Sequence, residues 1–142
     1  MRALYKIIHA NSLTKFGRVE QRIVDEDCWM SEQGHKIAII SPVHSPLYQK
    51  AKRCEFSVYP VSFKKRNTLN EFRKLIDIFN NEQPYAVHAH GYQGSYMTLK
   101  AARNASVSCR VLNIHKKEQV TGSLFVKKSL SGLSHYVFSG SE

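Results

Sequence analysis

The sequence predicts an α/β protein built on a parallel sheet, and three observations lead to this class. Short apolar runs of strand length alternate along the chain with longer segments of helical periodicity. Glycine, proline, asparagine and serine separate these segments. The connections between successive strands are long enough for helical crossovers. We therefore expect a doubly wound, Rossmann-like parallel sheet flanked by helices, in a single domain over residues 1–142.

Three predicted strands and two predicted helices fill the first half of the chain. The strands are short, apolar and rich in isoleucine or valine: Ala3–Ala10, Lys36–Ser41 and Ser57–Val61. A helix is expected over 18–33, and Gly34 ends it. Ser45 caps a second, shorter helix that Pro46 opens. Pro60 lies within the third strand, which places that strand near an edge of the sheet.

The first predicted helix is imperfectly amphipathic. Val19, Ile23 and Met30 lie on one stripe at helical spacing, as a surface that packs on a sheet requires. Glu26 and Asp27 interrupt this stripe. The pattern therefore predicts the helix more strongly than it predicts which of its faces packs on the sheet.

The second half of the chain begins with the strongest helix pattern of the sequence. This helix follows a cap at Asn67 or Thr68, and its apolar residues recur at spacings of three and four: Leu69, Phe72, Leu75, Ile76 and Phe79. Three further strands are predicted, at Tyr85–His90, Arg110–Ile114 and Tyr136–Phe138. Helices are expected between them, through Met97, Leu99, Ala101 and Asn104 and then over 124–133.

The chain carries an excess of basic residues, with a formal net charge of +10 over 142 residues. Such an excess favours polyanionic partners, which include nucleic acid, nucleotide phosphates and an anionic membrane surface. A solvated surface without a partner is the alternative for each single cluster. The basic residues cluster at four places: Lys50 with Lys52 and Arg53, Lys64 to Arg66, Lys116 with Lys117, and Lys127 with Lys128.

The cysteines and the first residues indicate where the protein is found. Cys28, Cys54 and Cys109 form no Cys-x-x-Cys pair, so we expect reduced, mostly buried thiols in a cytosolic protein. Lys6 interrupts the first apolar run, which therefore lacks the apolar core of a signal peptide. No apolar stretch reaches membrane-spanning length. The expected location is cytoplasmic, with any membrane contact peripheral at the inner face.

Polar residues gather where three of the predicted strands end. They are the loop Asn11–Gly17 after the first strand, His88, His90 and Gly91 at the end of the fourth, and His115 after the fifth. The carboxyl ends of parallel strands share one edge of the sheet, and ligands bind beyond that edge. We therefore expect these residues to converge on one crevice. Gly17, which precedes a helix, is a candidate contact for a phosphate.

A metal site in this crevice would need His88, His90 and His115 as ligands. Carboxylates commonly complete or orient such a site, and the only acidic residue near these histidines in the sequence is Glu118. We therefore expect no metal ion. A nucleophile is not indicated either, because no Gly-x-Ser-x-Gly elbow occurs and no cysteine stands at a predicted strand end.

Five short motifs follow one another in an order that is typical of one enzyme family. They are Gly17-Arg18-Val19-Glu20, Gln33-Gly34-His35-Lys36-Ile37, Ser45-Pro46-Leu47, Gln83-Pro84-Tyr85-Ala86-Val87-His88-Ala89-His90-Gly91, and Val137-Phe138-Ser139. Together they resemble the amino-terminal half of retaining GT-B glycosyltransferases of family 4, over nearly the whole chain. The resemblance implies that residues 1–142 form the amino-terminal, acceptor-side half of a GT-B architecture.

The resemblance also implies roles for individual residues. Gly17 and Arg18 would approach the diphosphate of the donor, where a glycine allows close contact with the backbone. His90 and Gly91 would line the acceptor side of the cleft. His115 would be the catalytic residue and contact the transferred sugar, and Lys116 would make a further substrate contact.

Two positions depart from the pattern of the family. Arg18 replaces the usual second glycine of the first loop, and it would either pair with a phosphate or block it. Tyr85 replaces the usual aspartate before the Val-His strand.

The implied function is the transfer of a sugar from a nucleotide-diphospho-sugar to a glycan or lipid-linked acceptor, in cell-surface polysaccharide or lipopolysaccharide biosynthesis. No cofactor is implied, since the donor is a substrate. Family members bind most of the donor in a carboxyl-terminal Rossmann domain that follows this half. We therefore expect this fragment to be inactive alone. Its expected partners are the donor, the acceptor, that domain and an anionic membrane surface.

Two other classes of function agree less well with the sequence. A basic α/β module that binds nucleic acid without catalysis would explain the net charge, but the aromatic residues do not interleave with the basic clusters. A flavodoxin-like or receiver-type domain needs carboxylates or a flavin-phosphate loop at the strand ends, and the sequence supplies neither.

Overall fold

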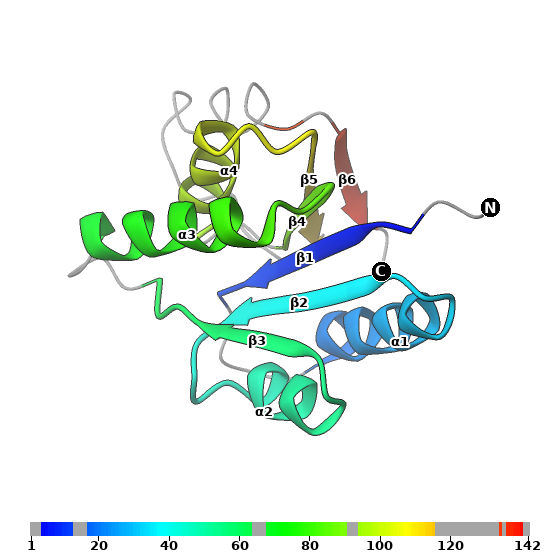
Figure 1. The fold of residues 1–142 in the computed structure, drawn as a ribbon. Helices are drawn as coiled ribbons and strands as arrows, with labels where there is room; N and C mark the ends of the chain where they lie inside the picture. The colour runs from blue at the N-terminus through cyan, green and yellow to red at the C-terminus, as the bar shows by residue number, and fades with distance from the viewer. Residues whose placement is uncertain are drawn as a thin grey trace.

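The structure is a computed structural model that describes residues 4–12, 17–63, 68–90, 94–115, 134 and 136–140. These residues form a single sheet of six parallel strands in the order β3-β2-β1-β4-β5-β6 (Figure 1). The strands are β1 (Lys6–Asn11), β2 (Lys36–Ser41), β3 (Ser57–Pro60), β4 (Ala86–His90), β5 (Cys109–His115) and β6 (Tyr136–Gly140). The helices are α1 (Arg18–Glu32), α2 (Pro46–Arg53), α3 (Thr68–Glu82) and α4 (Ser95–Asn104). The predicted fold class, a doubly wound Rossmann-like sheet, is confirmed.

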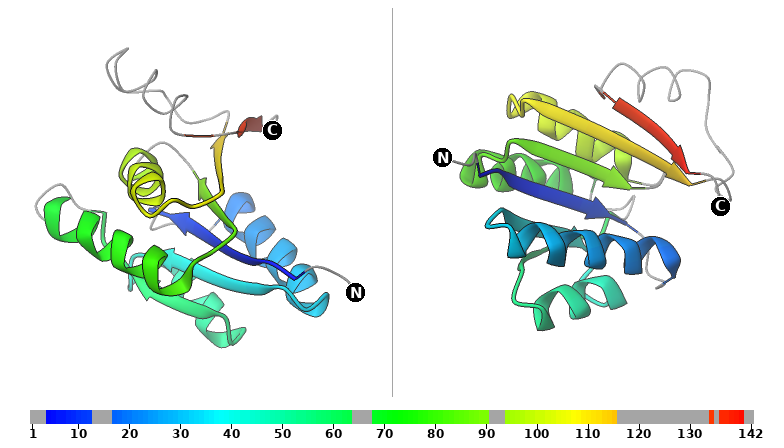
Figure 2. Two further views of the ribbon diagram at one scale, coloured as in Figure 1. Left: turned by 45° about the horizontal axis from the view of Figure 1, so that its top comes forward. Right: turned by 90° about the vertical axis from the view of Figure 1, so that its right-hand side faces the viewer.

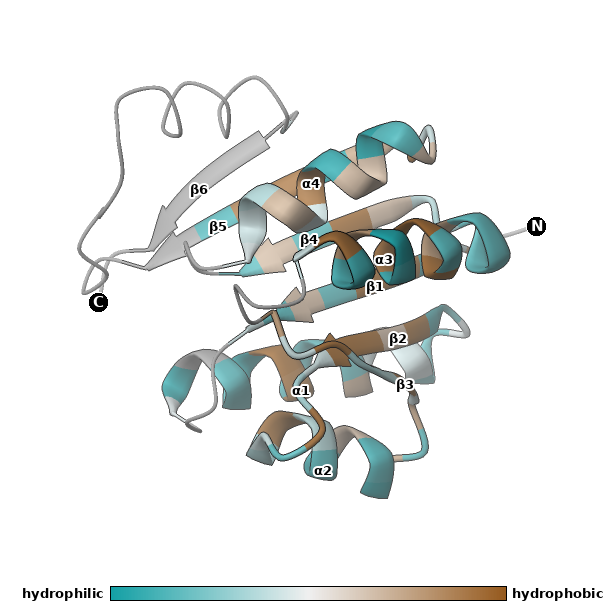
Figure 3. Cartoon of the chain, turned by 90° about the vertical axis from the view of Figure 1, so that its left-hand side faces the viewer, coloured by the Kyte–Doolittle hydropathy of each residue, from teal (hydrophilic) through white to brown (hydrophobic). Residues whose placement is uncertain are grey.

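Two apolar cores lie on opposite faces of the sheet. On one face, α3 and α4 bury Leu75, Phe79 and Ala101 against Ile8 and Val87 of β1 and β4. On the other face, α1 and α2 pack on β2 (Figure 2). The second core is formed by Ile23, Val24, Ile37, Ile39, Leu47 and Ala51. β2 is apolar along most of its length (Figure 3), as expected for a strand covered on both faces.

The ends of the helices follow from local chemistry. Ser45 Oγ accepts a hydrogen bond from the Tyr48 N–H at 3.1 Å, and Pro46 opens α2, as predicted. Gly34 follows α1 with a φ of +96°, a conformation that ends a helix and that glycine adopts without strain. Gly94 precedes α4 with a φ of +80°, and a Cβ there would lie 2.8 Å from Phe63 Cδ1. Gly94 therefore lets the chain after β4 pass close to Phe63.

Two side-chain predictions for these elements were wrong. The apolar stripe predicted for this helix, Leu69 included, is expected to face the core, but Leu69 lies in the first turn of α3 and is 60% exposed. The three cysteines are free, as predicted, yet they are half-buried and not mostly buried. Thr68 belongs to α3 itself, and its alternative as the cap, Asn67, lies outside the described residues. The helix predicted over 124–133 also lies outside them.

The position of β3 at an edge of the sheet agrees with the prediction from Pro60. Across the described ranges, none of the helices has both the length and the apolar character that crossing a bilayer requires.

Candidate functional site at the carboxyl edge of β1 and β4

The site lies where the order of the strands reverses. β1 pairs with β2 on one side and with β4 on the other. The helices that follow β1 and β4, α1 and α4, pack on opposite faces of the sheet. In open α/β sheets this switch point leaves a crevice beyond the carboxyl ends of the strands, where ligands bind.

Three histidines face one another across β1 and β4. The register pairs His9 with His88 and Asn11 with His90, so these four side chains share one face of the sheet. The ring centroids of His9, His88 and His90 lie 5.0 to 5.3 Å apart. The His9 and His90 side chains are buried, and His88 is half-buried. Convergence of His88 with His90 agrees with the prediction, whereas His9 was not singled out in the sequence.

A chain of polar contacts fixes His90. His9 Nδ1 and His90 Nε2 are 2.9 Å apart, and Asn113 Nδ2 of β5 is 3.5 Å from His90 Nδ1. The two contacts agree with one neutral tautomer of each ring, in which His90 donates to His9 and accepts from Asn113. In this arrangement both ring nitrogens of His90 face protein groups.

Asp27 of α1 completes this cluster. Its Oδ1 lies 2.8 Å from His9 Nε2, and the carboxylate has no exposed surface. In the tautomer given above, His9 Nε2 carries the ring proton and lies beside Oδ1, and Oδ2 has no hydrogen-bond partner among the described residues. The prediction against a metal site assumed that no carboxylate lies near these histidines except Glu118. That assumption is wrong, because Asp27 lies beside His9. Asp27 interrupts the apolar stripe of α1 because it faces His9.

His88 is a neutral ring over the physiological range. Burial lowers the pKa of His88 from its ordinary value of 6.5 to about 3, and the neighbouring His9 adds to the effect. A group with such a low pKa carries no charge near pH 7 and can accept a hydrogen bond or act as a ligand through a free nitrogen.

A second polar pair joins the end of β1 to the start of α1. Glu20 is buried, and its Oε2 accepts a hydrogen bond from the Gly17 N–H at 2.8 Å. Glu20 Oε1 accepts from Asn11 Nδ2 at 3.3 Å. Both ends of the loop that carries Gly17 are thus held by one carboxylate. The exposed Gly17 and Arg18 lie at the amino terminus of α1, on the same edge of the sheet as His90.

Gly17 is not required for the backbone conformation that it adopts. Its φ of −145° is extended, and a Cβ there would meet only Glu20 Oε2, at an ordinary 3.6 Å. The fold itself would therefore accept a side chain at this position.

The remaining predicted residues lie at or beyond the end of β5 and β4. His115 is the last residue of β5, and its backbone pairs with Gly140 of β6. It is two residues beyond Asn113, the partner of His90 in the register, so the backbone places it at the same edge. Gly91 and Lys116 lie outside the described residues. The roles of all these residues stay predictions.

One cavity of about 390 Å³ lies at the opposite, amino-terminal edge of the sheet. Its lining includes Lys6 and Lys36 at the starts of β1 and β2, and Glu82 at the end of α3. Lys6 and Glu82 form an ion pair at 3.1 Å. Because ligands of parallel sheets bind at the carboxyl edge, the histidine cluster is the better candidate for a functional site.

Solved structures with the same fold include enzymes that act on nucleotide sugars. MurG from Acinetobacter baumannii matches over 97% of this chain with a TM-score of 0.76 and 12% identity, and the match covers 42% of that protein. Anabaena HepE, solved in complex with UDP, matches over 93% with a TM-score of 0.67 and 13% identity, covering 36% of its chain. The UDP-GlcNAc 2-epimerase of Neisseria meningitidis, solved with UDP-GlcNAc, matches over 94% with a TM-score of 0.63 and 16% identity, covering 39%.

These likenesses, each at 16% identity or less, show the fold alone. The chain spans about two fifths of the length of these proteins. No match was found among curated protein sequences.

The sequence itself is assigned by a family model. The model described as glycosyl transferase 4-like matches residues 29–132, which is most of the chain. This match agrees with the GT-B fold of MurG and HepE and with the resemblance seen in the motifs. The chain belongs to the glycosyl transferase 4-like family.

Proposed function

We propose that this chain is the acceptor-side domain of a glycosyltransferase that moves a sugar from a nucleotide-diphospho-sugar to a glycan or lipid-linked acceptor. The observation that carries the proposal is the family match over residues 29–132. The buried polar cluster at the carboxyl edge of β1 and β4 supports it, because substrates of such sheets bind at that edge. UDP, UDP-glucose and UDP-GlcNAc are the ligands named for structures of the same fold.

Each substrate contact follows from a position at that edge. Gly17 and Arg18 begin α1, whose amino terminus favours an anionic group such as the donor diphosphate. His115 ends β5 and is proposed as the catalytic residue beside the transferred sugar. His90, Gly91 and Lys116 are proposed as contacts of the acceptor and donor. The transfer needs no cofactor, since the nucleotide sugar brings the activated group.

A second domain of the same enzyme would bind most of the donor. This part of the proposal rests on the share of MurG and HepE that the chain matches, 42% and 36%. Two domains of ordinary size would give a native protein about twice as long as 142 residues or longer. The pathway would be the synthesis of a cell-surface polysaccharide or lipopolysaccharide at the cytoplasmic side of the membrane.

Two measurements test the proposal. The intact mass of the native protein from its source cells gives its length. The native protein is then incubated with isotope-labelled nucleotide-diphospho-sugars and a lipid extract of the same cells. We expect a longer chain and label in a glycan or lipid product. Release of free sugar or an epimerised nucleotide sugar, without any labelled glycan or lipid, would contradict the assignment as a transferase.

A peripheral membrane contact is proposed from the net charge of +10. The protein should sediment with vesicles that contain anionic phospholipid at low salt, and not with vesicles of neutral phospholipid. Equal binding to both, or to neither, would contradict this part. Salt-dependent binding of labelled RNA at physiological ionic strength would instead favour the nucleic-acid alternative, which the family match does not support.

A further inference from the structure

We propose that His9, His88 and His90 form a binding site for one divalent transition-metal ion with the ligand preferences of zinc. Each ring offers a nitrogen atom, and the three nitrogens all lie within 4.8 Å of one another. Imidazole nitrogen is a common ligand of zinc, and three protein ligands with one open position form a recurring type of zinc site. This inference shares His90 with the proposed substrate contacts, but it is tested by metal binding alone, without any sugar transfer.

The two strands hold the ligands at a suitable separation. His9 Nδ1 and His90 Nε2 are 2.9 Å apart. Two nitrogens bound to one tetrahedral zinc ion, each at about 2.0 to 2.1 Å, would be separated by roughly 3.3 Å. An ion that replaces the shared proton would therefore need only a small opening of this pair. His88 stands beside His9 in the register and supplies the third nitrogen after a rotation of its side chain.

Asp27 distinguishes this cluster from a simple hydrogen-bonded pair of histidines. Its carboxylate is completely buried, Oδ1 lies 2.8 Å from His9 Nε2, and Oδ2 has no hydrogen-bond partner in the described part of the chain. A buried carboxylate whose charge is balanced only by a neutral ring is costly. Histidines that bind a metal through one nitrogen commonly direct the other toward a carboxylate, which orients the ring. His9 has this arrangement, with Nε2 toward Asp27 and Nδ1 toward His90.

Charge balance points the same way. Among the described residues, the ion pairs of lysine and arginine go to Glu82 and Glu26, and none reaches Asp27. The other groups around Asp27 that could titrate are imidazoles and the Cys28 thiol, and none of them is a lysine or arginine. A divalent cation on the three rings would offset the buried negative charge. The ion would then tie β1 to β4, and through Asp27 it would also tie both strands to α1.

The test uses the 142-residue protein without a histidine tag, stripped with a chelator and then dialysed. Zinc is titrated in by calorimetry, and cobalt(II) is titrated in a parallel experiment followed by visible absorption. We expect one ion per chain and the visible bands of tetrahedral cobalt. Absence of stoichiometric zinc binding would overturn the proposal. A thiolate-to-cobalt charge-transfer band would also overturn it, because the ion would then sit on the cysteines.

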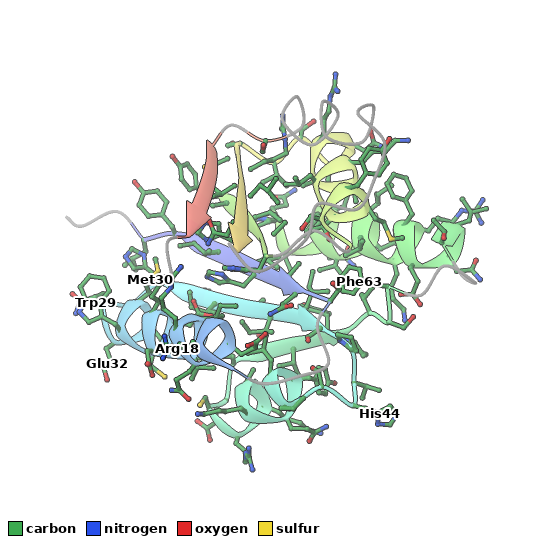
Figure 4. The ribbon with its side chains drawn as sticks, turned by 180° about the vertical axis from the view of Figure 1, so that it is seen from behind. Arg18, Trp29, Met30, Glu32, His44 and Phe63 are labelled. Carbon is green, nitrogen blue, oxygen red and sulfur yellow. The ribbon has the colours of Figure 1, made fainter. Side chains whose placement is uncertain are left out.

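Variants locate the ion. His88 is half-buried, so His88→Ala and His88→Gln should both fold, and each should lose tight zinc binding. Asp27→Asn should weaken zinc binding by about 10- to 100-fold, since the carboxylate only orients a ligand. His44→Ala is the matched control, because His44 is exposed and lies at the periphery of the molecule (Figure 4). Unchanged binding in both His88 variants, or an equal loss in His44→Ala, would overturn the assignment.

Discussion

The same two strands present opposite chemistry on the two faces of the sheet. Toward α3 and α4, β1 and β4 direct apolar side chains, and all of them are buried: Ile8, Ala10, Val87 and Ala89. Toward α1, the same strands begin with Ile7 and Ala86, and the alternate positions after them are polar: His9, Asn11, His88 and His90. The first face is a continuous apolar core, and the second is a polar cluster under one helix.

The difference shows which face stabilises the fold. Burial of a large apolar side chain stabilises a protein by about 1.5 to 3 kcal/mol. Burial of a polar group without a hydrogen bond destabilises it by about 1 to 3 kcal/mol. Among the described residues, the polar face contains such atoms, Asp27 Oδ2 and Asn113 Oδ1. Stability alone therefore does not account for the polar face, and the proposed binding of a substrate or an ion would give it a role.

The largest effect is expected on the apolar face. Leu75 is fully buried in the core against α4 and the sheet, so Leu75→Ala should lower the free energy of unfolding by about 2 to 5 kcal/mol. Leu69→Ala, on the exposed first turn of the same helix, should change it by less than about 0.5 kcal/mol. Urea denaturation followed by circular dichroism measures both. Similar losses in the two variants would contradict the assignment of the core.

The next effect is a dependence of stability on pH that comes from the polar face. The folded protein keeps His88 neutral down to about pH 3, whereas the unfolded chain binds a proton below about pH 6.5. Stability from this group is therefore complete above pH 6.5 and is lost as the pH falls toward 3, by at most about 1.4 kcal/mol per pH unit.

Urea denaturation of metal-free protein in chelator, at several values of pH between 3 and 7, measures this slope. His88→Gln removes the group that titrates and should flatten the profile by that amount. A slope that is the same in His88→Gln and in the wild-type protein would show that His88 does not remain neutral.

A smaller loss in the free energy of unfolding is expected at Ser45, a buried polar side chain that has hydrogen-bond partners. Ser45 Oγ accepts from the Tyr48 N–H and contacts Ser41 Oγ at 2.8 Å. Ser45→Ala removes the cap of α2 and should cost about 1 kcal/mol, measured as above. Aspartate also caps helices at exposed positions, but Ser45→Asp is unsuitable here because Ser45 is buried. Ser45→Thr is the control that retains the hydroxyl, and a loss equal to that of Ser45→Ala would argue against the cap.

The smallest effect on stability is expected at Asp27. Its buried Oδ1 lies beside His9 Nε2, and asparagine keeps an oxygen there, so Asp27→Asn in metal-free protein should leave the free energy of unfolding within about 1 kcal/mol of the wild type, or raise it. Breaking a buried ion pair lowers the free energy of unfolding by about 3 to 5 kcal/mol. Such a loss would mean that Asp27 is paired with a charged His9, and that the cluster needs no cation.

The elements of the fold were predictable because each one carries its own local pattern. Isoleucine-rich runs indicated β1 and β2, and the Ser45-Pro46 pair indicated the start of α2. Leu69 was misassigned because spacing along α3 does not show that its first turn extends beyond the sheet. Periodicity identifies a helical stripe, but the length of the contact depends on how the helix lies on its neighbours.

The candidate site was predictable only in part. His88 and His90 stood out because they end a strand, whereas His9 lies within an apolar run. One signal was present: His9 and Asn11 alternate with alanine in the same way as His88 and His90, which is typical of strands with one polar face. The contact between Asp27 and His9 depends on the rotation of α1 and on the pairing of β1 with β4, which no local pattern reveals.

The central claim is that sugar transfer takes place at the carboxyl edge of β4 and β5. Its most direct test is the turnover of labelled donor by the native-length protein and by its His115→Ala variant. His35→Ala is the control, because His35 lies at the amino-terminal edge, between α1 and β2. We predict a loss of about 100-fold or more for His115→Ala, with an unchanged circular dichroism spectrum, and near wild-type turnover for His35→Ala. Wild-type turnover in His115→Ala would contradict the claim.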